Sequence, residues 1–315
     1  MIKKIRSLLL AGVISIGVAG CSSTNTNKVE DKTKVALVLS TGGVNDQSFN
    51  QSAWEQGALK AEEEYGVEVS YLESNSDKDY MQNIETAVED NDLIVGVGFQ
   101  LGDAIKEAAK AYPDKQFITI DSENSNLDNV RAITFDEEEA GYLTGLIAGK
   151  TTNTNVIGWI GGMDIPSCSN FYVGYEKGAK EVNPNIKVLK QFTNSFSDAA
   201  KGKVVAQQMI NENADIIFTA SGGGNVGSLE AIKENNIYAI NVDMPGNYLA
   251  PQHVLTSALK NVGEGLRMTI EDYVNGDWTG GEVRYNYSNN GVGFEKTDLL
   301  SDEIIKYVED KLNNK

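Results

Sequence analysis

The residues most able to bind a ligand follow a short apolar run near the start of the chain. Residues 35–39 (VALVL) are typical of a strand buried on both faces, and Ser40 with a glycine pair ends it. Asp46, Phe49 and Asn50 follow this turn. Ligands of open α/β sheets bind in loops at the carboxyl ends of strands. Phe49 therefore has two interpretations: a hydrophobic staple for the next helix, or an aromatic platform for a flat ligand.

Similar groups recur wherever a predicted strand ends. They are Phe99, Gln100, Asp121, Asn170, Phe171, Gly222, Gly223, Asp243 and Lys260. Two aromatic rings could enclose a planar group, and carboxylates accept hydrogen bonds from hydroxyl groups. Polar groups that a wrong ligand leaves unpaired would provide discrimination. Taken singly, each residue is better explained as a helix cap or a core residue, so the predicted site depends on the topology.

Residues 222–227 (GGGNVG) satisfy the dinucleotide-binding pattern G-x-G-x-x-G between a predicted strand and a helix. We do not expect NAD binding for two reasons. The motif lies deep in the second half of the chain, and the first residues predict export, which leaves a protein little access to NAD. A glycine loop at a helix N-terminus also brings backbone N–H groups towards other polar ligands. Support for catalysis or metal binding is weaker, since the chain has no G-x-S-x-G, no C-x-x-C and one histidine. We expect no cofactor, no metal and no enzymatic activity, although 45 acidic residues leave a glycosidase-type carboxylate pair open.

The first 20 residues are predicted to lie outside the fold. Basic residues precede an apolar stretch, 8–18, that is too short to span a membrane. The residues VAG directly before Cys21 match a bacterial lipobox. We therefore predict a lipoprotein signal peptide at 1–20, lipidation of Cys21, a flexible tether at 21–33, and a location at the extracytoplasmic face of the cell membrane.

Charge and cysteine content limit the partners further. The net charge of −18 argues against nucleic acid, since phosphate binding needs a basic surface. Cys168 is the only cysteine after Cys21, so the folded part has no intramolecular disulfide. Cys168 is interpreted as an incidental thiol, because the only histidine, His253, has no evident relation to it.

Predicted strands and helices alternate along the chain in two blocks of similar size. The strands are expected at 35–39, 67–72, 93–99, 116–121, 156–161, 186–191, 215–219 and 237–242. Such alternation produces doubly wound parallel sheets, and 315 residues suit two lobes. Beyond these blocks we expect a strand at 254–259 and a helix at 263–275 to complete the first lobe, then a hairpin within 280–293.

The predicted architecture is thus α/β: two doubly wound parallel-sheet lobes around a hinged cleft, as in type I periplasmic binding proteins. We assign 34–133 and about 257–282 to lobe 1. Lobe 2 would then hold 134–256 and about 283–315, with the assignment of the C-terminal tail left open.

Five segments carry a family resemblance. They are GGVNDQSFNQSAW at 42–54, GVGF at 96–99, AGYLTGLIAGKTT at 140–152, FTNSFSDAAKGK at 192–203 and LTSALKNV at 255–262. Together they resemble the basic membrane lipoprotein family, the nucleoside-binding proteins of ABC importers, over nearly the whole mature chain. The resemblance implies stacking of a base on Phe49, hydrogen bonds from Asn50 to the base, and ribose contacts at Asp121, Asp243 and Lys260. It also implies an ABC permease as partner.

Four positions depart from the family's pattern, all at predicted strand ends or in ligand loops. Ser40 stands where relatives usually have an aspartate, and Asn170 stands where they usually have a basic residue. Gly224 replaces the threonine of a GGTG loop, and Pro245 lies where an Asp-Gln pair is usual. We expect a monomeric receptor for a nucleoside-like molecule. These departures leave open a different base edge, a riboflavin-like ring, a sugar or a signalling molecule. A surface hydrolase is the alternative from another class.

Overall fold

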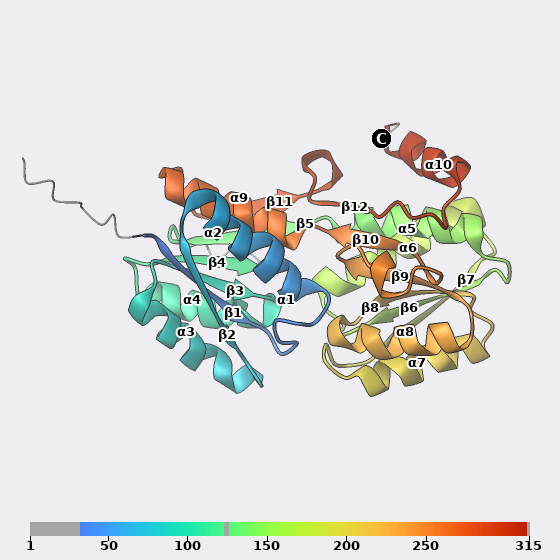
Figure 1. The fold of residues 1–315 in the computed structure, drawn as a ribbon, viewed down its shortest axis with the longest axis horizontal. Helices are drawn as coiled ribbons and strands as arrows, with labels where there is room; N and C mark the ends of the chain where they lie inside the picture. Colours follow the sequence, from blue (N-terminus) through green and yellow to red (C-terminus); the bar gives the residue numbers. More distant parts are fainter. Residues whose placement is uncertain (1–31, 123–125, 314–315) are drawn as a thin grey trace, which may run out of the picture. The chain divides into compact units, whose positions relative to one another are not determined.

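The computed structural model of the chain describes residues 32–122 and 126–313. The predicted signal peptide, the lipidation site Cys21 and most of the tether lie outside these residues. The described part contains two sheets of mainly parallel strands, each covered by helices (Figure 1). The predicted α/β class with two doubly wound sheets is confirmed. None of the helices in the described part is long and apolar enough to cross a membrane.

The first sheet has six strands in the order β11-β5-β4-β3-β1-β2, and every neighbouring pair is parallel. Its strands are β1 (Lys34–Leu39), β2 (Glu68–Glu73), β3 (Leu93–Val97), β4 (Gln116–Ile120), β5 (Val130–Phe135) and β11 (Gly281–Tyr285). Its helices are α1 (Phe49–Gln51), a π-helical segment (Ser52–Ala58), α2 (Leu59–Tyr65), α3 (Tyr80–Asp90), α4 (Gly102–Ala111) and α9 (Val262–Asn275).

The apolar run of β1 is explained by burial on both faces. Ala36 and Val38 belong to one core cluster, with residues of α3 and α4. The residues between them, such as Leu37, belong to a second cluster, with residues of the π-helical segment and α9. Because successive side chains of a strand point to opposite faces, only a continuous apolar run suits a strand covered on both sides.

The second sheet also has six strands, in the order β12-β10-β9-β8-β6-β7. Its strands are β6 (Val156–Gly161), β7 (Lys187–Phe192), β8 (Ile216–Ala220), β9 (Tyr238–Asp243), β10 (Val254–Lys260) and β12 (Val292–Phe294), of which only β12 is antiparallel to its neighbour. Its helices are α5 (Glu137–Thr151), α6 (Pro166–Val182), α7 (Ala199–Asn211), α8 (Asn225–Glu234) and α10 (Asp302–Asn313).

The chain passes between the two sheets three times. The passages, which we call the crossing segments, are residues 135–137, 260–262 and 285–292. The first and third are joined by the backbone N–H of Asp136, which donates to the carbonyl of Tyr285 at 2.8 Å. The second and third are joined by the N–H of Asn261, which donates to the carbonyl of Gly291 at 2.8 Å. The crossing segments are short and lie at the ends of elements, where hinge residues of two-lobed proteins are usually found.

Two predictions about the C-terminal part are wrong. The strand expected to complete the first lobe is β10, which lies in the second sheet, parallel to β9; only the helix that follows it, α9, packs beside the first sheet. The expected hairpin does not form, because β11 and β12 belong to different sheets. The residue bounds proposed for the two lobes stay a prediction.

One strand, β5, is absent from the prediction. Its sequence, VRAITF, carries Arg131 at a position that is 4% exposed. The Arg131 guanidinium donates to the carboxylate of Asp272 at 2.5 Å and to the carbonyl oxygen of Thr279 at 2.7 Å. The charge is therefore paired by groups that are distant in sequence, which a local apolar pattern cannot reveal.

Candidate functional site

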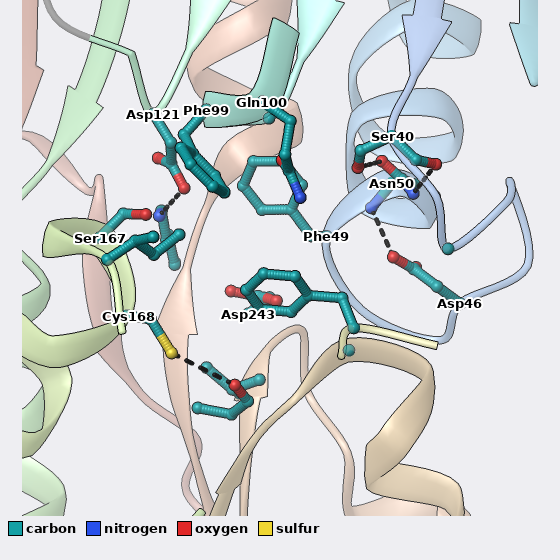
Figure 2. A pocket seen from close by; sticks show the side chains of 18 of the residues that line it. Ser40, Asp46, Phe49, Asn50, Phe99, Gln100, Asp121, Ser167, Cys168 and Asp243 are labelled. Atoms are coloured by element: carbon teal, nitrogen blue, oxygen red, sulfur yellow. Dashed lines mark hydrogen bonds and ion pairs between the residues drawn. The ribbon is translucent and has the colours of Figure 1, made fainter. Parts of the chain in front are cut away.

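A cavity lies between the loops at the carboxyl ends of the two sheets (Figure 2). The space between these loops is about 630 Å³, part of it open to solvent. Loops after β1, β3 and β4 line it from the first sheet. The second sheet contributes loops or strand ends after β6, β7, β8 and β9, and Lys260 is the last residue of β10.

The structure brings together all but two of the site residues predicted from the sequence. Those that line the cavity are Ser40, Asp46, Phe49, Asn50, Phe99, Gln100, Asp121, Phe171, Gly222, Asp243 and Lys260. Asn170 and Gly223 do not line it. Asn170 lies on α6 directly before Phe171, and of these two residues only Phe171 lines the cavity. Ligand binding by these residues stays a prediction.

Several lining residues were not predicted. They are Gly42, Gly98, Ile165, Ser167, Cys168, Phe196, Ala220 and Val242. Cys168 precedes Phe171 by three positions on α6, so helical spacing would have placed both on one face. Phe196 had no such signal. Its ring occupies the space beside Gly162, where a Cβ would stand 2.2 Å from the ring.

Close packing of α5 against α6 sets the position of Phe171. A Cβ on Gly141 of α5 would stand 2.2 Å from the backbone oxygen of Phe171. A Cβ on Gly174 of α6 would stand 1.9 Å from the backbone oxygen of Glu138. Only glycine permits this approach of the two backbones. The glycines therefore hold α6, and with it the Phe171 ring, close to the crossing segments.

The loop after β1 is held mainly by its own side chains. The Asp46 carboxylate accepts hydrogen bonds from the backbone N–H groups of Ser48, Asn50 and Gln51, at 2.9 to 3.1 Å. Burial raises the pKa of Asp46, whereas these backbone donors lower it. The Asp46 carboxylate thus pairs backbone N–H groups at the start of α1, as a helix-capping side chain does. Its main role in the structure is to shape the loop that carries Phe49.

Lys260 lies at the centre of a buried charge cluster. Its ammonium, on a side chain 2% exposed, donates to Asp121 Oδ2 at 2.6 Å and to Glu137 Oε1 at 2.9 Å. It also lies 5.3 Å from the centre of the Phe49 ring. Burial opposes the charge, but attraction by the surrounding carboxylates outweighs it and raises the pKa of Lys260 above its ordinary value. Burial raises the pKa of Glu137. Glu137 was not among the site residues predicted from the sequence.

Asp121 keeps one free oxygen in this cluster. Its Oδ1 atom is buried and accepts no hydrogen bond from any residue that the structure describes, while Oδ2 accepts from Lys260. A buried carboxylate oxygen without a donor is costly. A hydroxyl or N–H group of a bound molecule would remove that cost.

A hydrogen bond joins the two sides of the cavity. Ser48, in the loop after β1, donates through its hydroxyl to Oδ2 of Asp243, at the end of β9. Burial raises the pKa of Asp243 from 3.8 to about 7, although Lys260 and the Ser48 hydroxyl lower it. The first sheet is therefore in direct contact with the second through a carboxylate that titrates near neutral pH.

The chain is similar to known proteins in both sequence and fold. Residues 32–315 match the Bmp family, described as ABC transporter substrate-binding protein PnrA-like. A "CD4+ T-cell-stimulating antigen" of Listeria innocua is 37% identical over 331 residues, covering 96% of this chain and 93% of the relative. The "ABC transporter nucleoside-binding protein BmpA" of Lactococcus lactis is 35% identical over 345 residues, covering 100% of this chain and 98% of the relative. A solved solute-binding protein of an ABC transporter system from Aeropyrum pernix K1 is 29% identical, with a TM-score of 0.79, over 90% of this chain and 80% of its own.

Proposed function

Because the chain belongs to the Bmp family of ABC transporter substrate-binding proteins, we propose that it binds a nucleoside or nucleoside-like molecule between its two sheets. The family resemblance noted in the sequence is confirmed. The proposed ligand follows from the side chains that line the cavity.

The observation that carries the proposal is an unpaired carboxylate oxygen beside aromatic rings. Phe49, Phe99, Phe171 and Phe196 all line the cavity, and so does Asp121, whose buried Oδ1 atom accepts no hydrogen bond from any described residue. Phenylalanine rings favour a flat heterocycle, because aromatic pairs stack offset or edge to face. The free carboxylate oxygen requires a donor such as a ribose hydroxyl. A molecule with a flat ring and a hydroxylated sugar satisfies both.

The charges of the cavity favour a neutral ligand over a phosphorylated one. Among the described residues that line the cavity, Lys260 is the only lysine or arginine, and it is already paired with Asp121 and Glu137. Asp46, Asp121 and Asp243 line the same space. A phosphate group would meet carboxylates without a free cation, so a nucleoside suits the site and a nucleotide does not.

A thermal-shift panel tests this proposal. The purified chain is heated with nucleosides, the matching 5′-monophosphates, free bases, riboflavin and sugars, and titration calorimetry then measures the affinity of each compound that raises Tm. We expect stabilisation by at least one nucleoside and none by its monophosphate. Stabilisation by sugars or riboflavin alone would contradict the proposal, and so would turnover of the bound compound.

We also propose that Cys21 carries a lipid that holds the chain at the extracytoplasmic membrane face, where it delivers its ligand as a monomer to an ABC permease. The lipobox sequence before Cys21 supports this. Replacing Cys21 by Ser is expected to abolish fatty-acid labelling and release the chain from membranes. A labelled, membrane-bound variant would contradict it.

A further inference from the structure

Most polar groups near Phe49 are occupied within the protein. Asn50 donates through Nδ2 to the backbone oxygens of Ser40 and Gly43, at 3.3 and 3.2 Å. Its Oδ1 atom accepts the Ser40 hydroxyl at 3.1 Å. An amide has two N–H donors, so Asn50 has none left for a ligand. Ser40 has likewise used its only side-chain donor.

The Gln100 amide is the exception. Its side chain lies on the cavity wall, half-buried, and makes no hydrogen bond with any described residue. Figure 2 shows the amide projecting from above towards the region of the Phe49 ring. Gly98, at φ +115°, makes room for it: a Cβ there would stand 2.9 Å from Gln100 Oε1 and 3.2 Å from Ser40 Oγ. The free amide and the Ser40 oxygen are therefore neighbours on one wall.

We propose that Gln100 recognises the hydrogen-bonding edge of the ligand's ring and favours one donor next to one acceptor. This inference rests on the proposed function. A neutral amide presents an acceptor and a donor side by side, and the neighbouring Ser40 oxygen can only accept. A ring edge with a carbonyl beside an N–H is complementary to that amide. An edge with two adjacent donors would instead require two acceptors, as a carboxylate provides.

Inosine and guanosine separate these alternatives. Both offer a carbonyl beside a ring N–H, but only guanosine has a second donor, its 2-amino group, next to that N–H. We therefore expect the wild-type chain to bind both nucleosides, because the Gln100 amide pairs with the carbonyl and the ring N–H that they share. Gln100→Glu supplies two acceptors at the same length of side chain. It should raise the affinity of guanosine relative to inosine about tenfold or more, the range of one bidentate contact to a base edge.

Titration calorimetry on the full chain measures both affinities in three variants. Gln82→Glu, at an exposed position on α3, makes the same charge change outside the cavity and should leave the ratio as in wild type. Gln100→Ala removes the amide without adding charge and should weaken both ligands about tenfold without changing their ratio.

The inference is supported if the affinity of guanosine relative to inosine rises in Gln100→Glu and stays unchanged in the other two variants. An unchanged ratio, unchanged affinities in Gln100→Ala, or the same change in Gln82→Glu overturns it and leaves the proposed function intact. Failure of the wild-type chain to bind any nucleoside overturns the proposed function, and the role of Gln100 falls with it.

Discussion

Asp243 is expected to make the chain less stable as the pH rises from 5 to 8. Asp243 is 8% exposed, and burial raises the pKa of its carboxyl from 3.8 to about 7. The unfolded chain therefore loses this proton at lower pH than the folded chain does. The stability that comes from the raised pKa is complete below pH 3.8 and is lost as the pH rises through about 7.

The size of the effect follows from the two pKa values. Each unit of difference corresponds to about 1.4 kcal/mol, so the full effect is about 4 kcal/mol. Between pH 5 and pH 8 the unfolded carboxyl is ionised throughout, while the folded one changes from protonated to ionised. The contribution of Asp243 to the free energy of unfolding should fall by roughly 2–3 kcal/mol over this interval.

Asp243→Asn tests this reasoning, because asparagine has the same shape and cannot ionise. Urea unfolding, followed by tryptophan fluorescence at pH 5, 6, 7 and 8, yields the free energy of unfolding of both proteins. Asp46 and Glu137 also have raised pKa values, so only the difference between wild type and variant isolates Asp243. Asp103→Asn, at a fully exposed side chain, is the control. A difference between wild type and Asp243→Asn that stays constant across the pH series would refute the argument.

Three further substitutions test the cavity and its support. Lys260→Met leaves two buried carboxylates without their cation and should cost about 3–5 kcal/mol in urea unfolding; a loss below about 1 kcal/mol would show that the cluster is not paired as described. Phe49→Ala should weaken binding of a flat-ring ligand by about 1–3 kcal/mol in calorimetry, and an unchanged affinity would remove Phe49 from the site. Gly141→Ala should destabilise the chain by about 1–3 kcal/mol, since the new Cβ would stand 2.2 Å from the Phe171 backbone oxygen. Stabilisation by Gly141→Ala, the usual result for glycine in a helix, would contradict this close packing.

The loops of the site could be located from the sequence because parallel sheets obey a simple rule. A buried strand is a continuous apolar run, and the polar residues after it lie at the carboxyl edge of the sheet. Phe49, Asp121 and Asp243 each follow such a run, and they line one cavity. This prediction needs no knowledge of side-chain contacts, because parallel strands place the loops that follow them at the same edge of the sheet.

The hydrogen bonds of those loops could not be predicted, because they depend on distances between side chains. Asp46 and Asn50 are suitable ligand-binding residues by type, yet their hydrogen bonds are spent inside the loop. Gln100 differs from them only in having no partner among the described residues. Residue type states what a side chain can donate or accept, whereas the folded chain determines which of these groups are already used.

The sequence by itself determined the two-sheet α/β class, the family and the strand ends that form the cavity, because these follow from local periodicity and from motifs contiguous in the chain. Only the tertiary structure decided the sheet to which β10 belongs, the pairing of Arg131 in β5, and the meeting of Lys260 with Glu137. The physical reason is that an apolar strand has the same pattern in either sheet. A buried charge, in turn, is acceptable only beside partners that the chain brings from far away.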